Sequence, residues 1–455
     1  MSTLRVLALD HYFDQDLRAL EAHRQLEVRR FPYQRLRGRA VRDMGREVGR
    51  GLHNYNRADL AGARGRYAAW LSREVRNLYL ERAFDVIVLP SDTFFYVRTL
   101  PAAAHRLGVP VAVVQKETSI SSATMETFSS EVRTEAPFVS DLMTVCSERQ
   151  RDFWIRAGTP GQRIVITGQP RFDIYASARA MTAAPKPRVL FLTYALDAYV
   201  PGAGRGKGLR VWEPLRDATE RVLFDLARDG ACEVVVKCHP QQDHRAESRR
   251  IAQLAAPAWN DAVSVAADDA DTRELIMGSD VVVGFQTTAL YEAVAARRRV
   301  IYAAWGTQFE DLRSELLPFD QAPKTCVAHA SSPELLAAML TGSKPRSPAA
   351  CKRWYEHAIG TVDGHATDRV VSQLETLASS WSATDELRRL ERHRRSFAVG
   401  LLARSLAAEV VWTAAMPAAQ LVGERQRVAK RSRRAREGRV MATETLRGIG
   451  GGEHR

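Results

Sequence analysis

SDVVVGFQTTALYEAVAARRRVIYAA, residues 279–304, contains the pattern that decides the fold class. A run of valines ends at Gly284, residues 285–287 have the composition of a turn, and a helix is predicted from Thr288 to Ala296. A second apolar run, residues 299–303, follows the helix closely. Strand, helix and strand in this order are typical of a parallel sheet whose strands are buried on both faces.

The same alternation continues along most of the chain and predicts an α/β protein. Residues 58–82 carry apolar side chains at helical intervals and predict a long amphipathic helix. Residues 175–187 gather alanine and proline, as a linker between packed units does, so we expect two domains, residues 1–174 and 188–380. Their sheets should face each other across a cleft, with ligands beyond the carboxyl ends of the strands. The predicted strands are 5–9, 85–89, 110–115, 142–146 and 163–167, then 188–193, 233–237, 262–265, 280–284, 299–303 and 325–328.

The net charge of +13 is concentrated in two stretches. Residues 24–50, which begin at Arg24 and end at Arg50, hold nine arginines and three acidic residues. Residues 385–440 hold fourteen lysines and arginines against six acidic residues. Because the rest of the chain is close to neutral, we expect these two surfaces to meet an anionic partner: membrane lipid, nucleic acid or a polyanionic acceptor.

The second basic stretch contains a largely apolar segment, residues 396–423. Arg404 and Glu409 interrupt this segment, and Pro417 lies near its end. A central arginine costs about 2.5 to 3.5 kcal/mol in a membrane-spanning helix, so we expect residues 385–440 to form a basic amphipathic helical tail or a docked hairpin. The alternative is a solvated helical extension whose high arginine content partly reflects the base composition of the genome.

The five cysteines form no CxxC pair, and no His/Cys cluster has zinc-site spacing. The opening residues, MSTLRVLALDHYFD, hold one short apolar run, too brief for the core of a signal peptide. We therefore expect a cytoplasmic protein in a reducing compartment, with no structural metal.

The turn before the predicted helix at Thr288 is a candidate anion site. Free backbone N–H groups at a helix start attract phosphate, and the hydroxyls of Thr287 and Thr288 can add donors. Glu292 lies one turn deeper on the same helix face, where a carboxylate can accept hydrogen bonds from ribose hydroxyls. The alternative is that Thr288 only caps the helix and Glu292 is a solvated surface residue.

A second candidate is CEVVVKCHP, residues 232–240. Lys237 and His239 are two residues apart at the end of a buried strand, so their side chains share one face if the strand continues that far. The alternative is a lysine in solvent and a histidine satisfied by backbone groups.

The loop TYALDAYVPGAGRGKGLRVW, residues 193–212, contains GAGRGKG but fails the phosphate-loop pattern GxxxxGK[ST] at both ends. We interpret it as a mobile basic loop over the cleft. Before the linker, Glu117 follows a predicted strand and is our choice for an acceptor-side general base. Asp92, and Asp10 with His11, also follow strands and are its rivals.

Taken together, TGQPRFD at 167–173, KCHP at 237–240, the helix with Thr288 and Glu292, and DGHATDRV at 363–370 resemble the GT-B superfamily of nucleotide-sugar glycosyltransferases. The similarity is greatest to the bacterial surface-polysaccharide branch: CDP-glycerol glycerophosphotransferases and capsule transferases, with UDP-N-acetylglucosamine 2-epimerases as relatives. It covers roughly residues 1–380 and implies two Rossmann-like domains facing a cleft, joined to the basic C-terminal extension. The branch carries a His-Gly pair in the acceptor domain, where this chain has QKETSISS.

The resemblance also implies site roles. His239 would lie beside the donor diphosphate, Thr287 and Thr288 at its phosphates, and Glu292 at the ribose. Lys237 would add charge to the donor site, and Arg171, with the DGHATDRV segment, would lie near the hinge.

The expected reaction is metal-independent transfer of a sugar, or a polyol phosphate, from a nucleotide-activated donor to a cell-surface polysaccharide or lipid-linked acceptor. We expect no cofactor. The protein would be peripheral at the inner face of the plasma membrane, with residues 24–50 and the tail against anionic lipid.

Two other functions fit parts of the sequence. A UDP-sugar 2-epimerase would share the fold and the donor site but would need no acceptor. A nucleic-acid-binding protein would explain the charge, but the basic stretches are not interleaved with stacking aromatics, so nucleic acid is not the expected partner.

Overall fold

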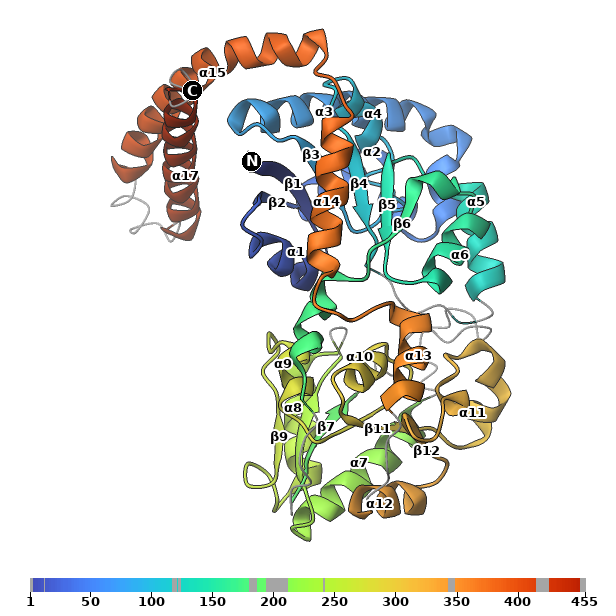
Figure 1. The fold of residues 1–455 in the computed structure, drawn as a ribbon. Coiled ribbons are helices and arrows are strands. Elements are labelled where there is room, and N and C mark those ends of the chain that lie inside the picture. Colours follow the sequence, from blue (N-terminus) through green and yellow to red (C-terminus); the bar gives the residue numbers. More distant parts are fainter. Residues whose placement is uncertain are drawn as a thin grey trace.

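The computed structural model describes residues 3–11, 13–116, 121, 124–179, 186–193, 212–239, 242–342, 348–414 and 425–450. Two six-stranded parallel sheets with covering helices form the body of the protein, and two long helices lie to one side of it (Figure 1). The expected α/β class with a helical C-terminal extension is therefore confirmed. The loop interpreted as a basic cover falls in residues 194–211, outside the described ranges.

The first sheet has the strand order β2-β1-β3-β4-β5-β6, and all its pairings are parallel. Strands β1, β3, β4 and β5 are apolar and almost fully buried, because helices cover both faces of the sheet. The strands are β1 (Leu4–Asp10), β2 (Leu26–Pro32), β3 (Val86–Leu89), β4 (Val111–Val114), β5 (Leu142–Val145) and β6 (Ile164–Ile166). The helices are α1 (Asp14–Glu21), α2 (Tyr33–Met44), α3 (Ala61–Glu81), α4 (Leu100–His105), α5 (Ser129–Glu135) and α6 (Glu148–Arg156).

The second sheet has the order β12-β11-β10-β7-β8-β9, again with parallel pairing throughout. Its strands are β7 (Arg188–Leu192), β8 (Glu233–Lys237), β9 (Val263–Val265), β10 (Val281–Gly284), β11 (Arg299–Ala303) and β12 (Val327–Ala330). Its helices are α7 (Glu213–Arg228), α8 (His244–Ala255), α9 (Thr272–Met277), α10 (Ala289–Ala295), α11 (Thr307–Leu312), α12 (Pro333–Thr341) and α13 (Pro348–Ile359).

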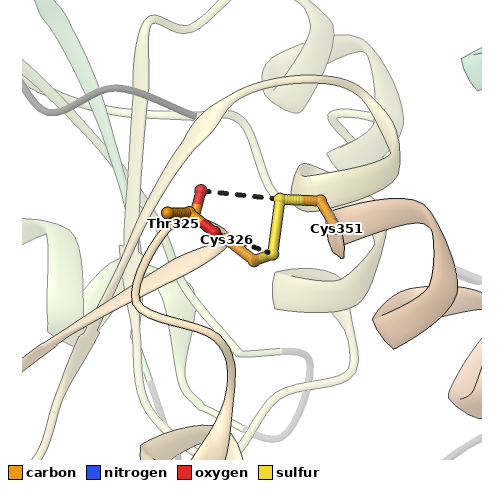
Figure 2. Close-up of a disulfide and its surroundings, with 3 residues drawn as sticks. All are labelled: Thr325, Cys326 and Cys351. Carbon is orange, nitrogen blue, oxygen red and sulfur yellow. Dashed lines mark hydrogen bonds between the residues drawn. A yellow bond between two sulfur atoms is a disulfide. The ribbon is translucent and has the colours of Figure 1, made fainter. Parts of the chain in front are cut away.

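A disulfide joins Cys326, just before β12, to Cys351 in α13 (Figure 2). The Cys351 sulfur also lies 3.5 Å from the carbonyl oxygen of Thr325. The bond fixes α13 against the edge of the second sheet. This pair was not predicted from sequence, because the two cysteines have a sequence separation of 25 and no local pattern links them.

The chain crosses between the domains twice, and the two crossings are bonded to each other. The first is the short helix η6 (Pro170–Ser177), and the second leads into α14 (Ala366–Ser379). Asp173 of η6 caps α14: its carboxylate accepts hydrogen bonds from Ala366 N at 2.9 Å, Thr367 N at 2.8 Å and Thr367 Oγ1 at 2.6 Å. The two segments that carried the resemblance, TGQPRFD and DGHATDRV, therefore meet at the crossing.

Gly360 allows the second crossing to pass close to the first domain. Its φ is +78°, and a Cβ there would lie 1.7 Å from the carbonyl oxygen of Cys146. Beyond it, α14 returns to the first sheet, where Val370, Val371 and Leu374 are buried in the core with β1 and α1. Figure 1 shows α14 lying along the first domain.

The last two helices, α15 (Asp385–Ala414) and α17 (Arg425–Gly450), lie side by side as a hairpin. The hairpin is joined to α3 of the first domain: Tyr79 donates to Glu391 at 2.8 Å, Arg76 pairs with Glu386, and Thr445 donates to the Glu81 carbonyl. Within the described ranges, none of the helices is both long and apolar enough to cross a membrane.

Candidate functional site

The strand order of the second sheet identifies where a ligand would bind. Strands β7, β8 and β9 are laid down in one direction and β10, β11 and β12 in the other, so the order reverses between β7 and β10. Ligands of open α/β sheets bind beyond the carboxyl ends of the strands at such a point. Thr193, His239 and Thr287 follow β7, β8 and β10, and so lie at this edge.

The turn between β10 and α10 is held rigidly by Gln286. This residue has a φ of +41°, and its side-chain amide donates to Tyr302 Oη at 2.7 Å and accepts from Leu317 N at 2.8 Å. Thr287 Oγ1 accepts from Ala289 N at 3.3 Å, whereas the Thr288 side chain makes no capping bond. The simple capping role considered for Thr288 is therefore taken by Thr287.

β8 ends at Lys237, so the strand alternation that would place Lys237 and His239 on one face does not extend to His239. The backbone N–H of His239 donates to Gln242 Oε1 at 2.6 Å and to Thr193 Oγ1 at 3.2 Å, which joins the ends of β8 and β7. Burial lowers the pKa of the His239 imidazole below its ordinary value of 6.5, so the ring is neutral at pH 7. The Lys237 ammonium donates to two carbonyls after β9, those of Ala267 at 3.1 Å and Asp268 at 2.7 Å.

Glu292 is buried at the boundary between the domains, with only 7% of its surface exposed. Tyr175 of η6 donates to its Oε2 at 2.8 Å. Burial raises the pKa of Glu292 above its ordinary value of 4.5, and the nearby positive charges of Arg171 and Arg273 oppose that rise. The solvated-surface alternative for Glu292 is therefore wrong, because the side chain is enclosed and hydrogen-bonded.

Arg171 connects η6 to the first domain. Its guanidinium donates to Asp16 Oδ2 at 3.3 Å and to the Lys116 carbonyl, just after β4, at 3.1 Å. Its backbone carbonyl accepts from Arg273 of the second domain at 3.3 Å. The structure thus brings Arg171 and Glu292 into one buried polar network, while His239, Thr287 and Thr288 lie at the strand ends.

Four members of this network were not among the residues predicted from sequence: Asp16, Tyr175, Asp271 and Arg273. Asp271 accepts from Gln15 of α1 at 3.1 Å, and Asp16 accepts from Gln169 at 2.8 Å. These pairs are 256 and 153 residues apart in the chain, so spacing gives no signal for them. The TGQPRFD and DGHATDRV segments, already singled out, pointed to this boundary.

On the acceptor side, Glu117 lies outside the described residues. Its rival Asp92 is fully buried and accepts from Val139 N at 2.9 Å and Ser140 N at 3.1 Å, which fixes the loop before β5. That arrangement gives Asp92 a structural role.

His11 follows β1, at the point where the strand order of the first sheet reverses. Its ring stacks on Tyr33 with centroids 3.9 Å apart, and its Nδ1 is hydrogen-bonded to the Tyr96 hydroxyl. Burial, reinforced by the charges of Lys116 and Arg37, lowers the pKa of His11 to about 4. The imidazole is therefore oriented and neutral at physiological pH.

The basic stretch 24–50 carries less free charge than its composition indicates. It forms β2 and α2, and five of its nine arginines are paired with acidic residues of the first domain. The pairs are Arg29 with Glu81, Arg30 with Asp14 and Glu21, Arg35 with Glu74, Arg39 with Asp43, and Arg50 with Glu47. Much of this charge stabilises the first domain internally.

Among the residues that the structure describes, no three histidine, cysteine, aspartate or glutamate side chains are grouped as metal ligands.

No protein-family model and no curated protein sequence matches the chain. Solved structures do match. A protein assigned as a UDP-N-acetylglucosamine 2-epimerase from Listeria monocytogenes aligns over 83% of this chain and 97% of its own, with 12% identity and a TM-score of 0.50. UDP-GlcNAc 2-epimerase from Methanocaldococcus jannaschii aligns over 82% and 99%, with 13% identity and a TM-score of 0.48. The wall teichoic acid polymerase TagF, as a variant, aligns over 83% and 89%, with 9% identity and a TM-score of 0.47. With its two parallel sheets and the double crossing between them, this chain has the GT-B fold.

Proposed function

We propose that this protein binds a nucleotide-activated sugar at the carboxyl ends of β7, β8 and β10, and transfers the sugar, or a polyol phosphate, to a cell-surface polysaccharide or lipid-linked acceptor. One observation carries the proposal. Thr193, His239 and Thr287 lie at the point where the second sheet reverses its strand order, and α10, which begins there, carries the buried carboxylate of Glu292.

The donor groups match a nucleoside diphosphate. The Thr288 hydroxyl, which is not used for capping, and the neutral His239 ring can donate to phosphate oxygens. As the bond to the sugar breaks, negative charge grows on the leaving phosphate, and donors already held in place stabilise it without reorganisation. Lys237 would contribute indirectly, because its hydrogen bonds to two carbonyls fix the loop after β9.

Glu292 would accept hydrogen bonds from the ribose hydroxyls through the carboxylate oxygen that Tyr175 does not use. Arg171 of the first crossing and Arg273 of α9 keep positive charge near it, and the Arg273 guanidinium donates to the Arg171 carbonyl. Donor binding at Glu292 would therefore change the contacts that Arg171 makes with the first domain, where we propose that the acceptor binds.

The acceptor hydroxyl must lose its proton as its oxygen attacks the sugar carbon and the bond to the leaving phosphate breaks. Glu117 remains our proposed base for this proton. His11 is the alternative among the described residues, because the Tyr96 hydroxyl orients its ring and its low pKa keeps it unprotonated. We place the reaction at the inner face of the plasma membrane, where such acceptors are presented.

A UDP-sugar 2-epimerase remains the second candidate, since the Listeria monocytogenes structure with the same fold is assigned that activity. Isomerisation of UDP-GlcNAc by the purified protein, with no acceptor added, would favour this function over transfer.

The proposal is tested by thermal unfolding of the full chain with UDP, CDP, CMP and GDP and their sugars. A ligand at a hundred times its Kd adds about 2.7 kcal/mol of stability, so a cognate nucleotide should raise the melting temperature clearly. Thr288→Val should weaken that response, while Thr376→Val, a matched change at an exposed position of α14, should not. If none of the nucleotides stabilises the protein, or if Thr288→Val responds as the wild type does, the donor site is wrong.

A further inference from the structure

The C-terminal hairpin is packed through small residues. Ser405 of α15 is buried, and a Cβ on Gly438 of α17 would lie 2.6 Å from its Oγ. Ala398 and Ala442 are also buried. Small residues let two helices approach closely, so α17 covers one face of α15.

The face of α15 away from α17 is apolar and exposed. Val399, Leu406 and Val410 are spaced at i, i+7 and i+11 and share one side of the helix, with Val411 beside them. Val410 is 68% exposed and Val411 57%. Of the ten large hydrophobic side chains that are exposed in the described residues, five lie on this hairpin. Such a concentration marks an interaction surface rather than scattered surface residues.

A basic groove runs between the two helices. Its lining is Arg404, Ser405, Ala408, Arg431, Arg434 and Ala435, and its volume is about 390 Å³. The nearby carboxylate of Glu409 is already paired with Arg436 and Arg439. Within the described part of the chain, neither Arg404 nor Arg434 has a carboxylate at ion-pair distance. Guanidinium groups bind phosphate oxygens in a planar, two-pronged geometry, so the groove suits a phosphate ester.

We propose that the α15–α17 hairpin docks on an anionic phospholipid bilayer, with the valine face of α15 among the headgroups and lipid phosphates at Arg404, Arg431 and Arg434. Both features are needed to choose this partner. A nucleic acid would use the arginines but not the valines, whereas an anionic bilayer offers negative charge and apolar surface together. Because contacts with α3 hold the hairpin, docking would also fix the orientation of the first domain.

This inference deepens the proposed function by naming the surface that meets the membrane, and it is tested without any donor. The full chain is sedimented with vesicles of phosphatidylcholine alone and with vesicles that also contain phosphatidylglycerol. Wild type should bind the second and not the first. The double change Arg404→Gln and Arg434→Gln should weaken binding about 30-fold, since each basic residue near an anionic surface contributes about a factor of five. Val410→Ser should weaken it about tenfold.

Matched controls lie in the second domain. Arg221→Gln in α7 and Leu254→Ser in α8 change an exposed arginine and an exposed leucine and should leave vesicle binding unchanged. Circular dichroism melting of every variant separates loss of binding from loss of folding. Nucleotide-induced stabilisation should persist in the hairpin variants, so failure of the docking surface and failure of the donor site are distinguishable.

Three results would overturn the proposal. The first is equal binding of wild type to neutral and anionic vesicles, or to neither. The second is a dimer in solution that Val410→Ser dissociates, which would assign the valine face to a second copy of the chain. The third is binding to mixed oligonucleotides that is lost in the double arginine variant and retained in Val410→Ser, while vesicle binding is unchanged in both variants.

Discussion

Replacing Glu292 with glutamine should separate stability from donor binding. The glutamine oxygen can still accept the hydrogen bond from Tyr175, but the buried charge is gone. Burial raises the pKa of Glu292, which means that the folded protein holds this proton more tightly than the unfolded chain does. Stability is therefore lost as pH rises from 4.5 through the folded pKa, and at neutral pH the charged form costs stability that Glu292→Gln restores.

Donor affinity should change in the opposite direction. A hydrogen bond to an ionised group contributes about 1.5 to 3 kcal/mol and a neutral one about 0.5 to 1.5, so glutamine should weaken binding of the cognate nucleotide sugar about five- to tenfold. Isothermal titration calorimetry and thermal unfolding of the same preparations measure both effects. Tyr175→Phe is the matched control: it removes the internal hydrogen bond but leaves the carboxylate, so its loss of affinity should be smaller. A Glu292→Gln protein that melts lower than wild type and binds the donor equally well would refute the reasoning.

Three further predictions follow from the same contacts. A donor phosphate beside His239 should raise its lowered pKa, so binding should take up protons as pH falls towards that pKa, an effect seen by calorimetry in buffers of different ionisation enthalpy and lost in His239→Gln. Identical proton uptake in the variant would exclude His239 from the site. Asp173→Ala removes the cap of α14 and should lower stability by about 2 kcal/mol in thermal unfolding, whereas Asp173→Asn, which can still cap, should lose less; equal losses would contradict the capping role. Cys351→Ser opens the disulfide to Cys326 and should cost about 3.5 kcal/mol for a loop of 25 residues, and reductant should bring wild type down to the variant; a wild type insensitive to reductant would contradict the bond.

The sequence was most informative where the burial of apolar side chains alone determines the local structure. Strands β8 and β11 have the predicted bounds, because runs of apolar residues report burial directly. The prediction missed β2, whose central residues are Arg29 and Arg30. Their charges hide the strand pattern, and only the fold shows that each meets an acidic partner on a neighbouring element.

The candidate site divides in the same way. The strand ends after β8 and β10 could be located from sequence, since a buried run followed by polar residues marks the edge of a parallel sheet. The partner of Glu292 could not be located, because Tyr175 lies 117 residues away and was counted as part of a linker. Likewise, the hydrogen bonds that Lys237 donates to the carbonyls of Ala267 and Asp268 could not be predicted, because they depend on how β9 packs beside β8.

The return of α14 to the first sheet decides which domain the hairpin belongs to. The C-terminal residues follow the second domain in the chain, but their contacts are with α3 of the first. A surface that held α15 would thereby fix the first domain, which on the proposed function receives the acceptor.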